Sequence, residues 1–201
     1  MSSIGKNGYS IIKDNIAKSE INNIRKDLTV KPFVNSGYNN ENTSFAIYAE
    51  SKRKLYLPRY YGIEHFGEVD TYKIEKGQDI NINFKGNLKA KQHPVVDAYM
   101  TAIKDKYTGG GIISVPCGYG KTVLALYIAA KLKLKTLVIV HKEFLLNQWK
   151  ERIEEFLPGS RVGRIQGNVI KVENKDIVIG MLQSLSMKEY DEKVFEEFLC
   201  I

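Results

Sequence analysis

Cysteine is scarce in this sequence, and long apolar stretches are absent. The chain has only two cysteines, Cys117 and Cys200, which are too few and too far apart for a disulfide framework or a four-cysteine zinc site. The first ten residues contain no apolar core of the kind a secretory signal needs. The longest notable apolar run, Val123 to Ala130, falls well short of the ~20 residues of a membrane-spanning helix. We therefore expect an intracellular, soluble protein with no membrane partner.

The composition is that of a folded protein with a modest excess of positive charge. Of 201 residues, 43% are apolar and 26% are charged, which argues against wholesale disorder. The net charge is +7, and residues 101–150 contribute most of it, with 8 basic and 2 acidic side chains. This excess is compatible with a polyanionic partner such as nucleic acid, but it equally fits a solvated basic face.

The first part of the chain indicates a small α+β domain. Residues 10–28 have apolar residues at helical spacing, whereas the stretch from Ile80 to Phe84 alternates apolar and polar residues like a half-buried strand. Short strands are expected at residues 45–48 and 55–57. We place the boundary near Gly86 and Asn87, which gives an N-terminal domain of residues 1–87 and a second domain of residues 88–201.

The second part alternates between helices and strands. The expected helices are residues 94–106, 121–133, 143–157 and 189–198. The expected strands are residues 112–115, 136–140, 162–165 and 177–179. Alternation at this spacing predicts an α/β fold, with a mostly parallel sheet covered by helices.

The clearest functional pattern is a glycine-rich loop between an expected strand and an expected helix. It reads Pro116-Cys117-Gly118-Tyr119-Gly120-Lys121-Thr122. Gly118 and Gly120 let the backbone turn and expose N–H donors to phosphates, and the helix that follows directs its positive end to the same place. Lys121 is placed to reach the β- and γ-phosphates, and the Thr122 hydroxyl to bind Mg²⁺. The alternative is a glycine-rich turn with a surface lysine, since Val115 stands where the full pattern has glycine.

This loop resembles that of superfamily 2 helicases, in particular the XPB-like branch. The resemblance implies an incomplete RecA-like lobe, the first of a helicase, with ATP and Mg²⁺ as cofactors. Residues 88–92 resemble the opening motif of that family, in which the glutamine, here Gln92, reads the adenine edge. A side-chain amide can both donate hydrogen bonds to adenine and accept them from it. The alternative is that Gln92 is an ordinary structural glutamine.

Further segments resemble the family motifs that contact a nucleic-acid strand. Residues 137–149 resemble motif Ia, which implies that His141 and Lys142 bind phosphates of the nucleic acid. Both residues follow an expected β-strand, and open α/β sheets bind their ligands at that end of the strands. For His141, the alternative is an ordinary loop histidine without a ligand. Residues 163–167 resemble the next motif, which implies backbone contacts at Arg164 and Gly167. In the motif at residues 179–185, Met181 replaces the usual threonine, so that Gln183 and Ser184 are left to supply a polar contact.

Several segments, including residues 57–62, resemble helicases of large DNA viruses, relatives of the poxvirus transcript-release helicase. This implies that residues 1–87 form a module like a DNA-damage-recognition domain, and that virion or transcription components are partners. The location would then be the host cytoplasm or nucleus, or the virion. The cations Lys52, Arg53, Lys54 and Arg59 with Tyr56, Tyr60 and Tyr61 suit a nucleic-acid surface. A solvated hairpin tip beside a tyrosine-rich core is the alternative.

The acidic Walker B segment of such helicases is missing from the sequence. Asp191 and Glu192 form an acidic pair, but no apolar strand precedes them. The chain is therefore expected to be the N-terminal part of an ATP-dependent helicase acting on nucleic acid, for which we expect DNA, or a naturally short copy. By itself it should hydrolyse little ATP. Two alternatives remain: a different phosphate-loop protein, such as a nucleotide kinase, and an inactive helicase-like component of a viral particle or transcription assembly.

Overall fold

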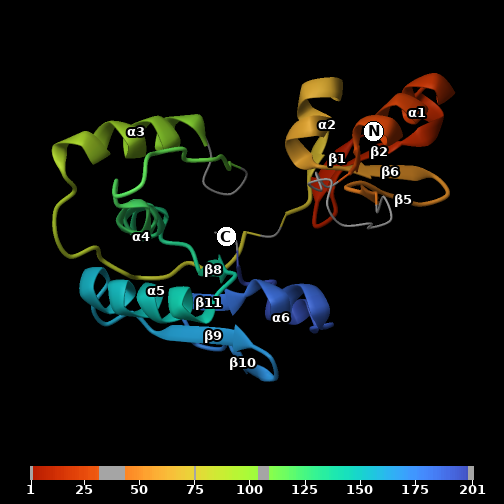
Figure 1. The fold of residues 1–201 in the computed structure, drawn as a ribbon. Coiled ribbons are helices and arrows are strands. Elements are labelled where there is room, and N and C mark those ends of the chain that lie inside the picture. Colours follow the sequence, from red (N-terminus) through yellow and green to blue (C-terminus); the bar gives the residue numbers. More distant parts are fainter. Residues whose placement is uncertain (1, 32–43, 75, 104–108, 199–201) are drawn as a thin grey trace, which may run out of the picture. The chain divides into compact units, whose positions relative to one another are not determined.

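The structure, a computed structural model, describes residues 2–31, 44–74, 76–103 and 109–198 (Figure 1). It consists of two compact units, Met1–Ile74 and Glu75–Ile201. The division falls earlier than the expected boundary at residues 86–87. The physical reason is that Ile80 and Ile82 are buried in the core of the second unit. The Ile80 backbone amide also donates a hydrogen bond to the backbone carbonyl oxygen of Lys133 over 2.9 Å.

The first unit is a small α+β fold. Its five-stranded sheet has the order β5-β6-β2-β1-β7, in which β1 and β7 are parallel and the other pairs antiparallel. The strands are β1 (Ser3–Gly5), β2 (Gly8–Ile12), β5 (Ala49–Glu50), β6 (Lys54–Leu57) and β7 (Thr71–Tyr72), and β3 (Thr29–Val30) pairs with β4 (Phe45–Ala46) apart from that sheet. The helices are η1 (Lys13–Asn15), α1 (Lys18–Asp27) and α2 (Arg59–Phe66).

Helix α1 is shorter than the spacing of residues 10–28 predicts. The first residues of that stretch belong to β2, where Ile11 pairs with Leu55 of β6, because the apolar side chains there gain a partner strand. From Lys18 onward the helical spacing holds, and α1 buries Ile21 and Ile24. The strand expected at residues 45–48 covers only Phe45–Ala46.

The second unit contains a four-stranded sheet of order β10-β9-β11-β8. Its strands are β8 (Thr136–Val140), β9 (Val162–Gln166), β10 (Val169–Lys171) and β11 (Ile177–Met181). Strand β11 is parallel to both β8 and β9, whereas β10 is an antiparallel edge strand. This confirms the expected α/β fold class, with parallel strands and helices as in a RecA-like lobe.

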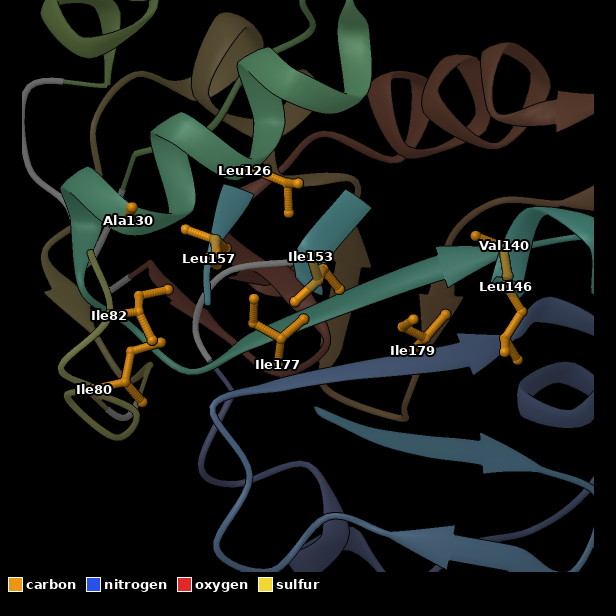
Figure 2. Packing of buried hydrophobic residues seen from close by; sticks show 10 residues of the cluster. All are labelled: Ile80, Ile82, Leu126, Ala130, Val140, Leu146, Ile153, Leu157, Ile177 and Ile179. Carbon is orange, nitrogen blue, oxygen red and sulfur yellow. The ribbon is translucent and has the colours of Figure 1, made fainter. Parts of the chain in front are cut away.

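Helices cover both faces of this sheet. The helices are η2 (Ala90–Gln92), α3 (His93–Ala102), α4 (Lys121–Leu132), α5 (Glu143–Phe156), α6 (Leu182–Met187) and η3 (Glu192–Val194). On one face, Leu126 of α4 and Ile153 of α5 pack with Ile177 and Ile179 of β11 (Figure 2). On the other face, Val178 packs with the half-buried Leu185 of α6. Each fully buried leucine or isoleucine stabilises the fold by about 1.5–3 kcal/mol, so these contacts hold the sheet between its helices.

Three expected elements of the second unit are wrong. Residues 80–84 alternate between buried and exposed side chains as predicted but form no strand, and residues 112–115 are not a strand either. A strand needs a neighbouring strand, and within the described residues the sheet ends at β8. Residues 189–198 contain only the 3-10 turn η3, which Asp191 caps by accepting a hydrogen bond from the Lys193 amide.

The helix expected at residues 94–106 is α3, which ends at Ala102, and residues 104–106 lie outside the described residues. Cys200 also lies outside them. Within the described part of the chain, none of the helices has the length and hydropathy that a membrane span requires.

Candidate functional site: a phosphate loop and a polar sheet edge

The phosphate loop, residues 116–122, leads directly into the first turn of α4. Gly118 and Gly120 have positive φ angles of 74° and 90°, in the left-handed region that glycine tolerates. A side chain at Gly120 would also collide with Gln92, because its Cβ would lie 2.6 Å from the Gln92 Nε2 atom. The first N–H groups of α4 have no acceptor within the helix. The start of α4 therefore has the exposed N–H groups that an anion site requires.

Lys121, the first residue of α4, keeps its charged group at the loop. Its Nζ atom donates a hydrogen bond to the carbonyl oxygen of Pro116 over 2.9 Å, and the residue is exposed. An ammonium bonded to a neutral carbonyl exchanges that partner readily for phosphate, since charge-assisted hydrogen bonds are stronger. Thr122 follows in the same helical turn and is half-buried, and Cys117 is exposed at the tip of the loop.

Gln92 holds the loop from the side. The residue is only 3% exposed. Its side-chain amide donates to the carbonyl oxygen of Tyr119 over 2.9 Å, and its side-chain oxygen accepts from the Lys89 amide over 2.8 Å. The Tyr119 hydroxyl donates in turn to the carbonyl oxygen of Lys91 over 2.5 Å. The structure thus brings Gln92 and the loop together, and both ends of the Gln92 amide bond to the protein, a role that the sequence did not reveal. Whether Gln92 reads adenine stays a prediction.

A second group of predicted residues meets at the carboxyl ends of β8, β9 and β11. Gln183 of α6 donates to the carbonyl oxygen of His141 over 2.7 Å. The Gly167 amide donates to the hydroxyl oxygen of Ser184 over 2.9 Å. Together with Lys142, these residues form what we call the polar edge. Because parallel strands end at one side of the sheet, segments far apart in sequence are joined here.

Glu143 carries a negative charge at the polar edge, a feature that the motif did not reveal. It is the first residue of α5, next to Lys142. Its carboxylate lies 3.5 Å from the side-chain nitrogen of Gln166, at the end of β9. A carboxylate stabilises the first turn of a helix but repels phosphate at the same place. The polar edge therefore carries a positive charge at Lys142 and a negative charge at Glu143 beside it.

Arg164 lies apart from the polar edge. It is in the middle of β9, with its exposed side chain on the α5 face, opposite Lys171 of β10. The motif at residues 163–167 therefore divides, with Gly167 at the edge and Arg164 on the face of the sheet.

The tyrosine-rich basic segment of the first unit is only partly exposed. Tyr60 is 54% exposed, with the Arg59 guanidinium 5.6 Å from its ring centroid. Tyr61, by contrast, stacks on His65 at 3.9 Å between ring centroids and packs on the core. Of the two open readings, Tyr60 fits the surface and Tyr61 fits the core.

Comparison with known proteins places these features in a family. The family model described as "Type III restriction enzyme, res subunit" matches residues 85–201. A candidate ATP-dependent RNA helicase, L396, of Acanthamoeba polyphaga mimivirus is 34% identical over 196 residues, which are 95% of this chain and 37% of that protein. A DNA 3'-5' translocase, XPB2, of Sulfurisphaera tokodaii is 37% identical over 99 residues, which are 49% of this chain and 21% of that protein.

The chain is also similar to a viral protein that is named for transcript termination. Transcript termination protein A18 of Yaba monkey tumor virus is 29% identical over 124 residues, which are 56% of this chain and 25% of that protein. The chain thus spans well under half the length of the curated relatives it matches. The family model covers more than half of the chain, and virus helicases and an XPB translocase are among the relatives of the chain. The chain therefore belongs to the superfamily 2 helicases, in the XPB-like branch that includes helicases of large DNA viruses.

Proposed function

We propose that this chain binds ATP at the phosphate loop and a nucleic-acid strand at the polar edge, as the front part of an ATP-dependent helicase or translocase. The observation that carries the proposal is the geometry of residues 116–122. Two glycines in left-handed conformation open the first turn of α4, and the ammonium of Lys121 lies on the loop.

In this proposal the backbone of the loop, Lys121 and Thr122 have different tasks. The backbone amides around Gly118 and Gly120 and the start of α4 bind phosphate oxygens. Lys121 moves from the Pro116 carbonyl to the β- and γ-phosphates, and Thr122 supplies a hydroxyl ligand to Mg²⁺. The metal would neutralise phosphate charge. Gln92 keeps Tyr119 and Gly120 in place, next to the position proposed for the adenine.

The polar edge would hold the backbone of the strand. Lys142 supplies the positive charge, and His141, Gly167, Gln183 and Ser184 supply polar groups around it. Contacts of this kind fix the position of a nucleic acid without reading its sequence. We expect DNA as the substrate, in line with the relative that is named a DNA translocase. Another relative bears the name of an RNA helicase, so the test below uses both nucleic acids. The relative named a transcript termination protein makes transcription components the partners we propose.

A salt titration of strand binding tests the nucleic-acid part of this proposal. Fluorescent single-stranded DNA and RNA of equal length are titrated with the chain at several salt concentrations. Lys142→Ala should weaken binding and make the negative slope of log K against log salt shallower by about 0.7, the value for one phosphate contact on a single strand. Lys131→Ala, which removes an exposed lysine from the last turn of α4, is the matched control. A larger effect of the control than of Lys142→Ala would exclude the polar edge as the binding site.

A further inference from the structure

A basic groove lies on the α5 face of the sheet, away from the polar edge. It is a cavity of about 280 Å³ between α5 and strands β9, β10 and β11. We define the basic groove by its polar lining, which consists of Asn147 and Lys150 of α5, Arg164 of β9 and Lys171 of β10. Leu146 and Ile179 are among the residues that form its apolar part.

Two cations lie side by side in the lining of this groove. Arg164 and Lys171 are direct partners in the register of β9 and β10, so their side chains stand on the same face. Like charges directly opposite each other destabilise a sheet. Among the described residues no carboxylate forms an ion pair with either of them, and Lys150 has only a long exposed pair with Glu154 at 3.9 Å. The groove therefore concentrates positive charge that the described part of the chain does not neutralise.

The backbone is shaped to bring these cations together. At Gly163, the residue before Arg164, a Cβ atom would lie 2.0 Å from the carbonyl oxygen of Lys171. Any side chain there would force β10 away from β9. A glycine at this position is therefore needed for the close approach of Lys171 to Arg164.

The chemistry of the groove selects phosphate groups carried on a backbone. Guanidinium and ammonium groups with an amide beside them bind phosphate oxygens by charge-assisted hydrogen bonds. The lining contains no aromatic side chain on which a base could stack, and such stacking contributes about 1–3 kcal/mol per base in single-strand binding. We propose that the basic groove binds the phosphodiester backbone of a nucleic-acid strand, as a second contact besides the polar edge. This inference rests on the proposed function.

The test uses the paired cations. In the double variant Arg164→Gln with Lys171→Gln, the negative slope of log K against log salt for a single strand should become shallower by about 1.4, two contacts at 0.7 each. The melting temperature should equal or exceed that of the wild type, because a repulsive pair has been removed, and this shows that the variant is folded. Lys150→Gln, on another element, should make the slope shallower by about 0.7. The control is Lys131→Gln with Lys133→Gln, two exposed lysines outside the groove, for which the slope should not change.

The outcomes separate this inference from the proposed function. If the wild type binds the strand and Lys142→Ala makes the slope shallower, but both groove variants leave it unchanged, the groove proposal is overturned and the proposed function stands. If the wild type binds neither DNA nor RNA at any salt concentration, both are overturned. If inorganic phosphate raises the melting temperature of the wild type but not of the double variant, while the slope for the strand is unchanged, the groove binds free phosphate and not a strand.

Discussion

The side-chain amide of Gln92 donates a hydrogen bond to the carbonyl oxygen of Tyr119 over 2.9 Å, and this joins the turn η2 to the phosphate loop. The same nitrogen would lie only 2.6 Å from a Cβ atom at position 120. The glycine at 120 and the glutamine at 92 therefore depend on each other, because one leaves the space that the other fills. A residue that the family resemblance links to the base thus also shapes the loop for which we propose phosphate binding.

Gln92→Ala should lower the affinity for both ATP and GTP, because Tyr119 and Lys89 lose their buried partner. Leaving a buried polar group without its hydrogen bond costs about 1–3 kcal/mol, which corresponds to roughly tenfold or more in affinity if the loop must be restored on binding. The measurement is a titration with fluorescent ATP and GTP analogues. Unchanged affinity for both would contradict the holding role. A selective loss for ATP would support the reading of adenine, whereas equal loss would leave Gln92 as a positioning residue.

Glu143→Gln should strengthen binding of a single strand at low salt. The substitution removes a negative charge next to Lys142, and one charge at contact distance is worth about 1 kcal/mol in water, or roughly fivefold in affinity. The gain should disappear at high salt, where exposed charges are screened. The control is Glu151→Gln, further along the exposed side of α5. Weaker binding by Glu143→Gln would show that the carboxylate contributes to the site.

The ion pair between Arg161 and Asp176 should make stability depend on pH. The Arg161 side chain donates to Asp176 over 2.7 Å and 3.1 Å, and its backbone amide donates over 2.7 Å. Burial raises the pKa of Asp176, but the hydrogen bonds and charge of Arg161 outweigh burial, and this pKa lies below its ordinary value. A carboxyl with a lower pKa in the folded state stabilises the fold at neutral pH, and the contribution is lost as the pH falls from about 4 through the lowered value.

Asp176→Asn should therefore reduce the free energy of unfolding by about 1–3 kcal/mol at pH 7. Urea unfolding at pH 7 and pH 3 is the measurement. The difference between variant and wild type should shrink at pH 3, where the wild-type carboxyl begins to protonate. An equal difference at both pH values would mean that the loss comes from packing and not from the charge of Asp176.

The sequence predicted the elements that have a strong apolar pattern of their own. Strand β8 at Thr136–Val140 agrees with the prediction, and α4 and α5 agree to within one residue at their ends. Residues 80–84 show the limit of such patterns. Ile80 and Ile82 are buried as the alternation predicts, yet among the described residues no strand pairs with this segment. Whether a segment pairs depends on residues far away in the chain.

The contacts among the residues of the candidate site could not be predicted from the sequence. Motif resemblance named Gln92 and Arg164, but it did not show that Gln92 bonds to Tyr119 or that Arg164 faces Lys171. The first depends on the conformation of the loop and the second on the register of a hairpin. A slip of one residue in that register would turn Lys171 to the other face of the sheet. Neither relationship leaves a local pattern in the sequence.

Binding of ATP with Mg²⁺ by Lys121→Ala tests the central claim most directly. The lysine is exposed, and within the described part of the chain its side chain bonds only to the Pro116 carbonyl. Its removal should therefore leave the melting temperature near that of the wild type. Loss of a charged partner for phosphate should weaken ATP binding about tenfold to a hundredfold, whereas Lys131→Ala, at the other end of α4, should bind ATP like the wild type. If folded Lys121→Ala bound ATP as tightly as the wild type, residues 116–122 would not be a phosphate loop, and the account of this chain as an ATP-binding part of a helicase would be contradicted.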